Sequence, residues 1–214
     1  MKESERQTDA ALHAAIPAAG FSRRMGEPKL LMPIAGQPLI RHLVDQLQHP
    51  SIASISILVR AEDTALIDCL ETTTATVVTT EVPTRDMRES VERLIREIGQ
   101  SACHNTSDGL LLIPADYPFV AKNVLYKLVV QWIAAPDRIV LPIFEGRRGH
   151  PVIFPWDVVS QVDEIPADSG LNWLVKKFPE RVLEVVVDDP SIHWDVDTPD
   201  DFRRISEFVQ NRLK

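Results

Sequence analysis

The stretch HAAIPAAGFSRRMGEPKLL, residues 13–31, joins a short apolar run to a loop that carries glycines and cations. The run from His13 to Ala18 is apolar enough to form a buried first strand, and Gly20 ends it. In open α/β sheets, ligands bind outside the carboxyl ends of the strands, where such loops lie. The stretch therefore predicts an α/β fold and places a ligand site directly after its first strand.

Outward from this stretch, strand and helix patterns alternate along the chain. Strand patterns are expected at residues 52–59, 75–80, 110–113, 138–144 and 181–187. Helix patterns are expected at residues 38–48, 64–71, 86–98 and 123–134, twice within 155–178, and from Pro199 onward with Thr198 as N-cap. Repeated βα units predict a mostly parallel sheet covered by helices on both faces, a three-layer α/β/α arrangement. We expect a single domain over residues 13–214, preceded by a disordered tail at residues 1–12.

Composition and charge argue against several classes of protein. The 214 residues carry a net charge of −8 with a pI near 5.2, so no broad basic surface for nucleic acid is expected. Two cysteines, Cys69 and Cys103, are too few for a disulfide framework. No apolar run approaches the ~20 residues of a membrane span, and the charged first residues lack the apolar core of a secretory signal. We therefore expect a cytoplasmic protein that binds neither nucleic acid nor membrane.

The loop at residues 18–29 has the features of a phosphate-binding site. Gly20 and Gly26 let the backbone approach a ligand closely, and backbone N–H groups in such loops can surround phosphates. Arg23, Arg24 and Lys29 add three cations to an otherwise acidic chain. The spacing fits neither a Walker loop nor the dinucleotide-binding Gly-x-Gly-x-x-Gly motif. A surface turn with solvated charges is the alternative, but glycines, cations and position after the strand together favour a triphosphate site.

Two carboxylates, Asp116 and Asp197, are candidates for holding the metal that accompanies a triphosphate. Asp116 follows the apolar run at 110–113, so we expect it at the carboxyl end of a central strand, and Asp197 stands at the start of the last helix. Mg²⁺ is commonly held by one or two carboxylates together with phosphate oxygens and water. Alternatively, Asp116 is a turn residue before Pro118 and Asp197 a helix-capping residue. Because the phosphate loop is present, we predict Mg²⁺ on both aspartates, with Asp195 as the rival for the second position.

Several sequence blocks carry a family resemblance. They are Ala18-Ala19-Gly20-x-Ser22-x-Arg24-Met25-Gly26-x-Pro28-Lys29-Leu30-Leu31, Pro33-x-x-Gly36-x-Pro38-Leu39-Ile40, Pro114-Ala115-Asp116-x-Pro118-Phe119-Val120, Arg148-Gly149-His150-Pro151-Val152-x-Phe154 and Asp195-x-Asp197-Thr198-Pro199-Asp200-Asp201. In this order and at this spacing, the chain closely resembles the MobA-like nucleotidyltransferases, and is nearest the molybdenum cofactor cytidylyltransferase branch. The resemblance implies a Rossmann-like nucleotidyltransferase fold.

The resemblance also implies roles for individual residues. The residues implied to bind the nucleotide are Ala18, Ala19, Gly20, Ser22, Arg23, Arg24, Met25, Gly26, Lys29, Met87 and Ser90. The residues implied to be catalytic are Arg24, Lys29 and Asp116. Asp116 and Asp197 are implied to hold Mg²⁺. The residues implied to bind the acceptor are Arg148, Gly149 and His150. We expect His150 to hydrogen-bond or neutralise an acceptor phosphate rather than act as general base, because such a phosphate is already largely ionised near neutral pH. A polar turn residue is the alternative for His150.

Three positions depart from the family pattern. Asp86 replaces a glycine that the family often shows before Met87 and Ser90. The alternative for these two is that Met87 is a core residue and Ser90 an ordinary helix residue. Asn172 stands near a position where many relatives carry arginine, and Pro17 stands where they usually carry leucine. These changes leave the phosphate-binding and metal-binding residues intact, so they leave open the acceptor and the base of the nucleotide.

Residues and resemblance together predict an Mg²⁺-dependent nucleotidyltransferase that moves CMP from CTP onto the phosphate of molybdopterin and releases pyrophosphate. Arg24, Lys29 and the loop amides are expected to hold the β- and γ-phosphates. The alternatives are the same chemistry with GTP or with a sugar or alcohol phosphate, a non-catalytic module that binds nucleotide or cofactor, and a scaffold protein. The four intact residues Arg24, Lys29, Asp116 and Asp197 argue against a non-catalytic module. Clustering of the motifs after strands argues against a scaffold.

Overall fold

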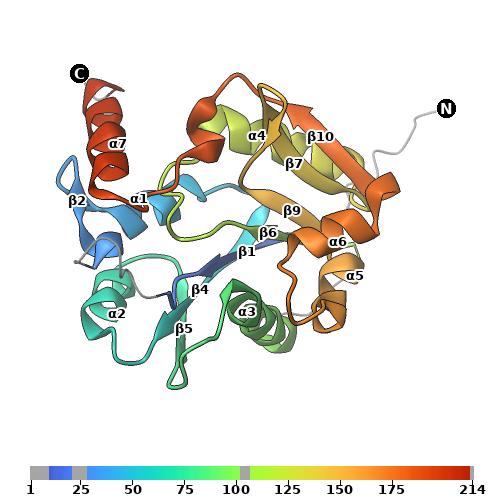
Figure 1. The fold of residues 1–214 in the computed structure, drawn as a ribbon, viewed down its shortest axis with the longest axis horizontal. Coiled ribbons are helices and arrows are strands. Elements are labelled where there is room, and N and C mark those ends of the chain that lie inside the picture. Colours follow the sequence, from blue (N-terminus) through green and yellow to red (C-terminus); the bar gives the residue numbers. More distant parts are fainter. Residues whose placement is uncertain (1–9, 21–27, 102–106, 213–214) are drawn as a thin grey trace.

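One central sheet dominates the computed structural model, which describes residues 10–20, 28–101 and 107–212 (Figure 1). Its strands are β1 (Leu12–Pro17), β4 (Ile52–Arg60), β5 (Thr76–Thr80), β6 (Gly109–Leu112), β7 (Ile139–Phe144), β8 (Arg147–Arg148), β9 (Val152–Pro155) and β10 (Val182–Val186). They are ordered β10-β7-β9-β6-β1-β4-β5, with β8 paired to β7. A separate two-stranded sheet consists of β2 (Pro33–Ile34) and β3 (Gln37–Pro38).

Among the described residues, four of the seven strand pairs of the central sheet are parallel. β1 lies between β4 and β6 and is parallel to both, β5 is parallel to β4, and β10 is parallel to β7. β9 runs antiparallel between β6 and β7, so β6 and β7 share one direction. The carboxyl ends of the parallel strands therefore meet at one edge of the sheet, which is where ligands bind in such folds.

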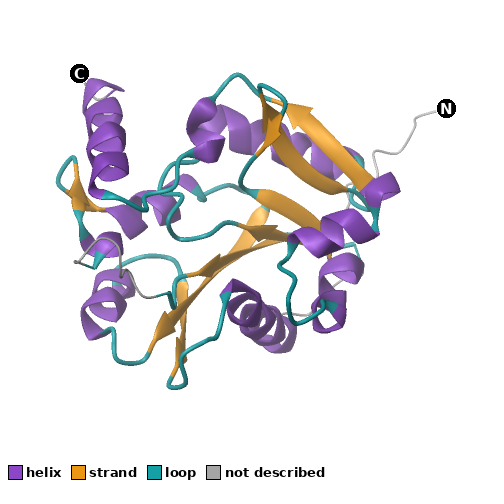
Figure 2. Cartoon of the chain, viewed as in Figure 1, coloured by secondary structure: helices purple, strands orange, loops and turns teal. Residues whose placement is uncertain are grey.

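Helices cover both faces of the sheet, as the cartoon shows (Figure 2). They are α1 (Leu39–Gln46), α2 (Thr64–Glu71), α3 (Met87–Ser101), α4 (Lys122–Ala134), α5 (Trp156–Val159), α6 (Asn172–Lys177) and α7 (Pro199–Arg212), with short 3₁₀ turns η1 (Lys29–Leu31), η2 (Ser160–Glu164), η3 (Pro179–Arg181) and η4 (Pro190–His193). Alternate residues of β1 enter separate cores: Ala14 and Ile16 pack with α1 and α4, whereas Ala15 packs with α3 and α5. This confirms the predicted three-layer α/β fold.

The predicted elements match the structure where the apolar pattern is long, and α2 has the predicted bounds. The first strand begins at Leu12 and ends at Pro17, one residue earlier at each end than predicted. Three short features were not predicted: the β2–β3 hairpin, β8 and the antiparallel strand β9. These strands have two to four residues, too few to show a periodic pattern, and β9 in addition depends on pairing with β6 and β7. Among the described residues, no helix has the length and apolarity needed to span a membrane.

Candidate active site

The ammonium of Lys29 joins the two aspartates that the sequence singles out. Its Nζ lies 3.2 Å from Oδ2 of Asp116 and 3.2 Å from Oδ1 of Asp197, and it donates to the carbonyl of Val196 at 2.8 Å. The lysine comes from η1, Asp116 from the loop after β6, and Asp197 from the turn before α7. We refer to Lys29, Asp116 and Asp197 as the carboxylate centre. Lys29 was expected at the phosphates, but here its ammonium lies on the carboxylates, whose negative charges attract it.

Backbone hydrogen bonds hold the segments of the carboxylate centre together. The amide of Val196 donates to the carbonyl of Asp116 at 2.8 Å, which ties the Asp197 turn to the loop after β6. The amide of Ala115 donates to the carbonyl of Pro17 at 3.4 Å, which ties that loop to the end of β1. The centre therefore lies at the carboxyl ends of β1 and β6, the position predicted for Asp116.

The two oxygens of the Asp116 carboxyl group differ in their contacts. Burial raises the pKa of this group, and the Lys29 ammonium, which binds Oδ2, opposes that rise. Oδ1 is buried and has no hydrogen-bond partner among the described residues, an expensive arrangement for a carboxylate unless a donor or cation reaches it. No three His, Cys, Asp or Glu residues gather into a metal cage in the described part of the chain, so a cation here needs further oxygens from a ligand. This donor set fits Mg²⁺, which takes few carboxylates and keeps phosphate and water ligands.

Tyr117 and Asp195 extend the acidic side of the carboxylate centre. Burial, followed by the charges of Asp195, Asp116 and Asp197, raises the pKa of the Tyr117 hydroxyl to about 12. The phenol therefore stays protonated near neutral pH and can donate a hydrogen bond. Lys29 binds Asp197, whereas Asp195 acts on Asp116 through its charge, so Asp197 is the better placed second carboxylate. Sequence reasoning missed Tyr117; its position directly after Asp116 was the available signal.

His150 lies beside Tyr117 as a neutral imidazole. Burial lowers the pKa of its imidazole to about 4, although a hydrogen bond with the Leu112 backbone partly opposes this shift. The ring packs edge-on to Tyr117, with the ring centroids 4.7 Å apart, and its buried Nδ1 finds no hydrogen-bond partner in the described ranges of the chain. Because the ring is neutral near pH 7, His150 can offer a hydrogen bond to an acceptor but cannot neutralise its charge.

The two residues before His150 have structural partners. A Cβ on Gly149 would lie 2.5 Å from the carbonyl oxygen of Ile192, so this close backbone approach requires glycine. The His150 amide donates to the same carbonyl at 3.0 Å, which fixes the segment against η4. Arg148 forms an ion pair with Glu184 of β10, with Nε and Nη2 each 2.7 Å from Oε1. Acceptor binding by Gly149 and Arg148 stays a prediction beside these packing and pairing roles.

The first part of the expected nucleotide site is only partly described. Ala18 and Ala19 are buried, so their side chains belong to the core and their backbone alone is left for a ligand. Gly20 is exposed, with open space where a Cβ would lie. The other expected residues of this loop, Ser22, Arg23, Arg24, Met25 and Gly26, lie outside the described residues.

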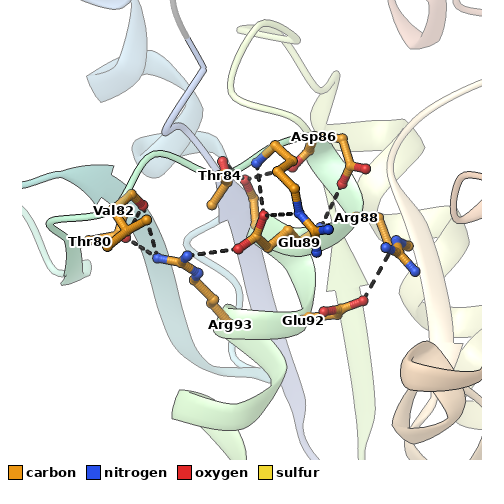
Figure 3. A network of polar contacts seen from close by, with 10 residues as sticks. Thr80, Val82, Thr84, Asp86, Arg88, Glu89, Glu92 and Arg93 are labelled. Carbon is orange, nitrogen blue, oxygen red and sulfur yellow. Dashed lines mark hydrogen bonds and ion pairs between the residues drawn. The ribbon is translucent and has the colours of Figure 1, made fainter. Parts of the chain in front are cut away.

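The loop between β5 and α3 is held by side chains of α3 (Figure 3). Glu89 accepts hydrogen bonds from the amide of Arg85 and from Nη2 of Arg93, both at 2.8 Å, and these lower its pKa to about 2. Arg93 also donates to the hydroxyl of Thr80 and, at 3.1 Å, to the carbonyl of Val82. Sequence reasoning named none of these interactions, because charged residues on a helix face more often contact solvent.

Met87 and Ser90, the other expected nucleotide contacts, lie in the first turns of α3. Met87 is 46% exposed, whereas Ser90 is buried with its hydroxyl 2.8 Å from that of Thr84. Asp86, which replaces the family's glycine, accepts the amide of Glu89 at 2.9 Å through Oδ1 and so caps the helix. This departure therefore has a structural reason, and Ser90 is engaged inside the protein.

Comparisons with known proteins identify a family and relatives of this chain. A sequence profile described as MobA-like NTP transferase domain matches residues 14–182. The molybdenum cofactor guanylyltransferase of Rhizobium meliloti (strain 1021) is 25% identical over 220 residues, which cover 94% of this chain and 96% of that protein. The molybdenum cofactor cytidylyltransferase of Escherichia coli (strain K12) is 23% identical over 194 residues, which cover 90% and 94% of the two chains.

A comparison with solved structures supports the same fold. The crystal structure of Rv0371c from Mycobacterium tuberculosis H37Rv has a TM-score of 0.76 and 24% identity, and covers 92% of this chain and 99% of that chain. A further structure of that protein, a complex with manganese, has a TM-score of 0.71.

Proposed function

The chain belongs to the MobA-like NTP transferase domain family, and from this premise we propose that it transfers CMP from CTP to a phosphate-bearing acceptor of the molybdopterin type. Pyrophosphate is the second product. Two observations support the proposal: the blocks at residues 18–31, 114–120 and 195–201, and the full-length similarity to molybdenum cofactor nucleotidyltransferases.

The carboxylate centre is the observation that carries the proposal. Lys29 binds both Asp116 and Asp197, and within the part of the chain that the structure describes the buried Oδ1 of Asp116 has no hydrogen-bond partner. These groups stand at the end of β1, and the segment that contains Gly20, Arg23 and Arg24 follows β1 in the sequence. Two carboxylates of this kind suit a metal-bound triphosphate, because Mg²⁺ takes few protein carboxylates and would keep phosphate and water ligands.

The proposed reaction is an in-line substitution at the α-phosphorus. An oxygen of the acceptor phosphate forms a bond to the α-phosphorus while the bond from that phosphorus to the α–β bridging oxygen breaks. Pyrophosphate leaves with that electron pair. Asp116 and Asp197 would hold Mg²⁺, which supplies charge stabilisation at the reacting phosphates. Lys29 keeps the two carboxylates close together, the Tyr117 hydroxyl can donate a hydrogen bond, and Arg24 would bind the leaving phosphates.

GTP is the second candidate donor. The guanylyltransferase of Rhizobium meliloti is similar over 94% of this chain, and the cytidylyltransferase of Escherichia coli over 90%. A sugar or alcohol phosphate is the second candidate acceptor, since the carboxylate centre would serve either. These candidates differ in the base and the acceptor, not in the chemistry at the α-phosphorus.

Pyrophosphate release tests the proposal. The full chain is incubated with Mg²⁺ and each of CTP, GTP, ATP and UTP, with and without molybdopterin. We expect pyrophosphate release with CTP that depends on molybdopterin. Release with GTP and with no other nucleotide would identify GTP as the donor in place of CTP. No release with any of the four nucleotides would contradict the proposed reaction. The Asp68→Asn variant, on the surface helix α2, is the matched control for substitutions in the carboxylate centre.

A further inference from the structure

Two adjacent arginines, Arg147 and Arg148, form β8 at the end of a hairpin with β7. Arg147 lies opposite Phe144 and Arg148 lies opposite Ile143 in the antiparallel pairing. Successive residues of a strand point to opposite faces, so the two side chains diverge. Arg148 turns to Glu184 and pairs with it at 2.7 Å. Arg147 therefore lies on the face away from that ion pair.

The Arg147 face is joined to the segment that supplies the acidic residues of the site. The ring of Phe144, on the same face, lies 6.2 Å from the ring of His193. Nε2 of His193 lies 3.1 Å from the carbonyl of Arg147, within hydrogen-bond distance. His193 ends η4, and Asp195 and Asp197 follow it directly in the chain.

The guanidinium of Arg147 is available to a ligand. Its side chain is exposed, and within the described residues it makes no hydrogen bond or ion pair, whereas Lys29 and Arg148 are both held by carboxylates. An acceptor phosphate that approaches Asp116, Asp195 and Asp197 meets more carboxylates than the Lys29 ammonium alone can balance, and this disfavours its binding. A guanidinium at this rim offsets that repulsion and can bind two phosphate oxygens at once.

We propose that Arg147 binds the phosphate of the acceptor and so selects phosphate-bearing acceptors for the site. The proposal rests on the proposed nucleotidyl transfer and names the residue that positions its second substrate. Arg148, adjacent and of the same type, pairs with Glu184 of β10. The two arginines therefore lie on opposite faces of β8, with Arg147 on the face of Phe144, whose ring lies near His193.

Phosphate binding tests the assignment without turnover. Inorganic phosphate is titrated by calorimetry into the full chain and into the variants Arg147→Ala, Arg147→Lys and Arg96→Ala, the last on α3 at an exposed arginine that pairs with Asp163. We expect Arg147→Ala to weaken binding about tenfold, Arg147→Lys to recover part of that loss as a point charge, and Arg96→Ala to stay within about twofold of the parent. The assignment is overturned by an unchanged Arg147→Ala variant, by equal losses in the two alanine variants, or by a parent chain that does not bind phosphate.

Kinetics with the acceptor separate this assignment from the reaction itself. We expect Arg147→Ala to raise the KM for the acceptor about tenfold while the KM for the nucleotide stays unchanged. A raised KM for the nucleotide would overturn the acceptor assignment and place Arg147 at the donor. If phosphate binding depends on Arg147 but no nucleotide is transferred, the binding site stands and the proposed function fails.

Discussion

The carboxylate centre and the loop between β5 and α3 both hold or adjoin residues expected in the site, but different interactions hold them. In the centre, a Lys29 side chain that is 14% exposed bridges two acids, and a backbone hydrogen bond joins their loops. In the loop, Glu89 pairs with Arg93, which is 27% exposed, and with Arg85, which is 78% exposed. Charges shielded from water interact strongly and are little affected by salt, whereas exposed pairs contribute little. The comparison teaches that the centre should be sensitive to any substitution and the loop more tolerant.

The largest effect is expected from Asp116→Asn. The amide keeps the shape of the side chain but loses the charge that holds Lys29 and would hold Mg²⁺, so turnover should fall by about 10²-fold or more. Pyrophosphate release, compared with Asp68→Asn on α2, measures the loss. Near-full turnover in Asp116→Asn would contradict the role of this carboxylate.

The next largest effect is expected from Lys29→Met, this time on stability. Removal of the ammonium leaves Asp116 and Asp197 repelling one another and the Val196 carbonyl without its donor, so the free energy of unfolding should fall by about 2 kcal/mol. Urea unfolding measures this change, and the exposed Lys122→Met on α4 is the control. Equal stabilities of the two variants would show that Lys29 does not hold the centre together.

A smaller effect is expected from Glu89→Gln in the β5–α3 loop. Loss of the charge weakens the bonds from Arg85 and Arg93, which should cost about 1 kcal/mol of unfolding free energy. Because the folded pKa of Glu89 is lowered to about 2, its stabilisation is present above its unfolded pKa and is lost as the pH falls towards 2.

The acid side of the stability profile therefore distinguishes Glu89 from its neighbours. Urea unfolding between pH 2 and 6, a window that spans the folded and unfolded pKa of Glu89, should show a shallower loss of stability in Glu89→Gln than in the parent chain. Glu92→Gln is the control, because its contact with Arg88 is longer, at 3.7 Å. Identical acid profiles for Glu89→Gln and the parent would contradict the account.

The smallest effect is expected at the helix cap. Asp86→Gly restores the residue that the family often shows and should cost only a few tenths of a kcal/mol, whereas Asp86→Ala should cost about 1 kcal/mol, because alanine caps poorly. Thermal unfolding of both variants measures the difference. A larger loss in the glycine variant than in the alanine variant would show that Asp86 does not act as a cap.

The fold was predictable because long apolar patterns specify its layers. Alternate residues of β1 enter two cores, and α2 has the bounds that its periodicity predicts. β9 was not predictable: Val152–Pro155 has four residues, and its antiparallel place between β6 and β7 depends on partners that are far away in the sequence. Short strands with distant partners carry no local signal of their direction.

The site was predictable in its charges but not in its pairings. The pairing of Asp116, after a strand, with Asp197, at the start of the last helix, was predicted from the phosphate loop and the family resemblance, yet the place of Lys29 between them needed coordinates. The sequence also could not tell Arg147 from Arg148, because the face of each side chain depends on how β8 pairs with β7 and on where Glu184 lies. The neutral state of His150 depends on burial, which spacing does not reveal.

Transfer of the α-phosphate tests the central claim most directly. CTP labelled at its α-phosphorus is incubated with Mg²⁺, molybdopterin and either the full chain or its Asp197→Asn variant, and the products are separated. We predict that the parent chain places the label on the acceptor and that Asp197→Asn loses most of this transfer, because the carboxylate centre loses one of its two charges. Label that stays in CTP, or that appears only as free CMP, would contradict nucleotidyl transfer to this acceptor.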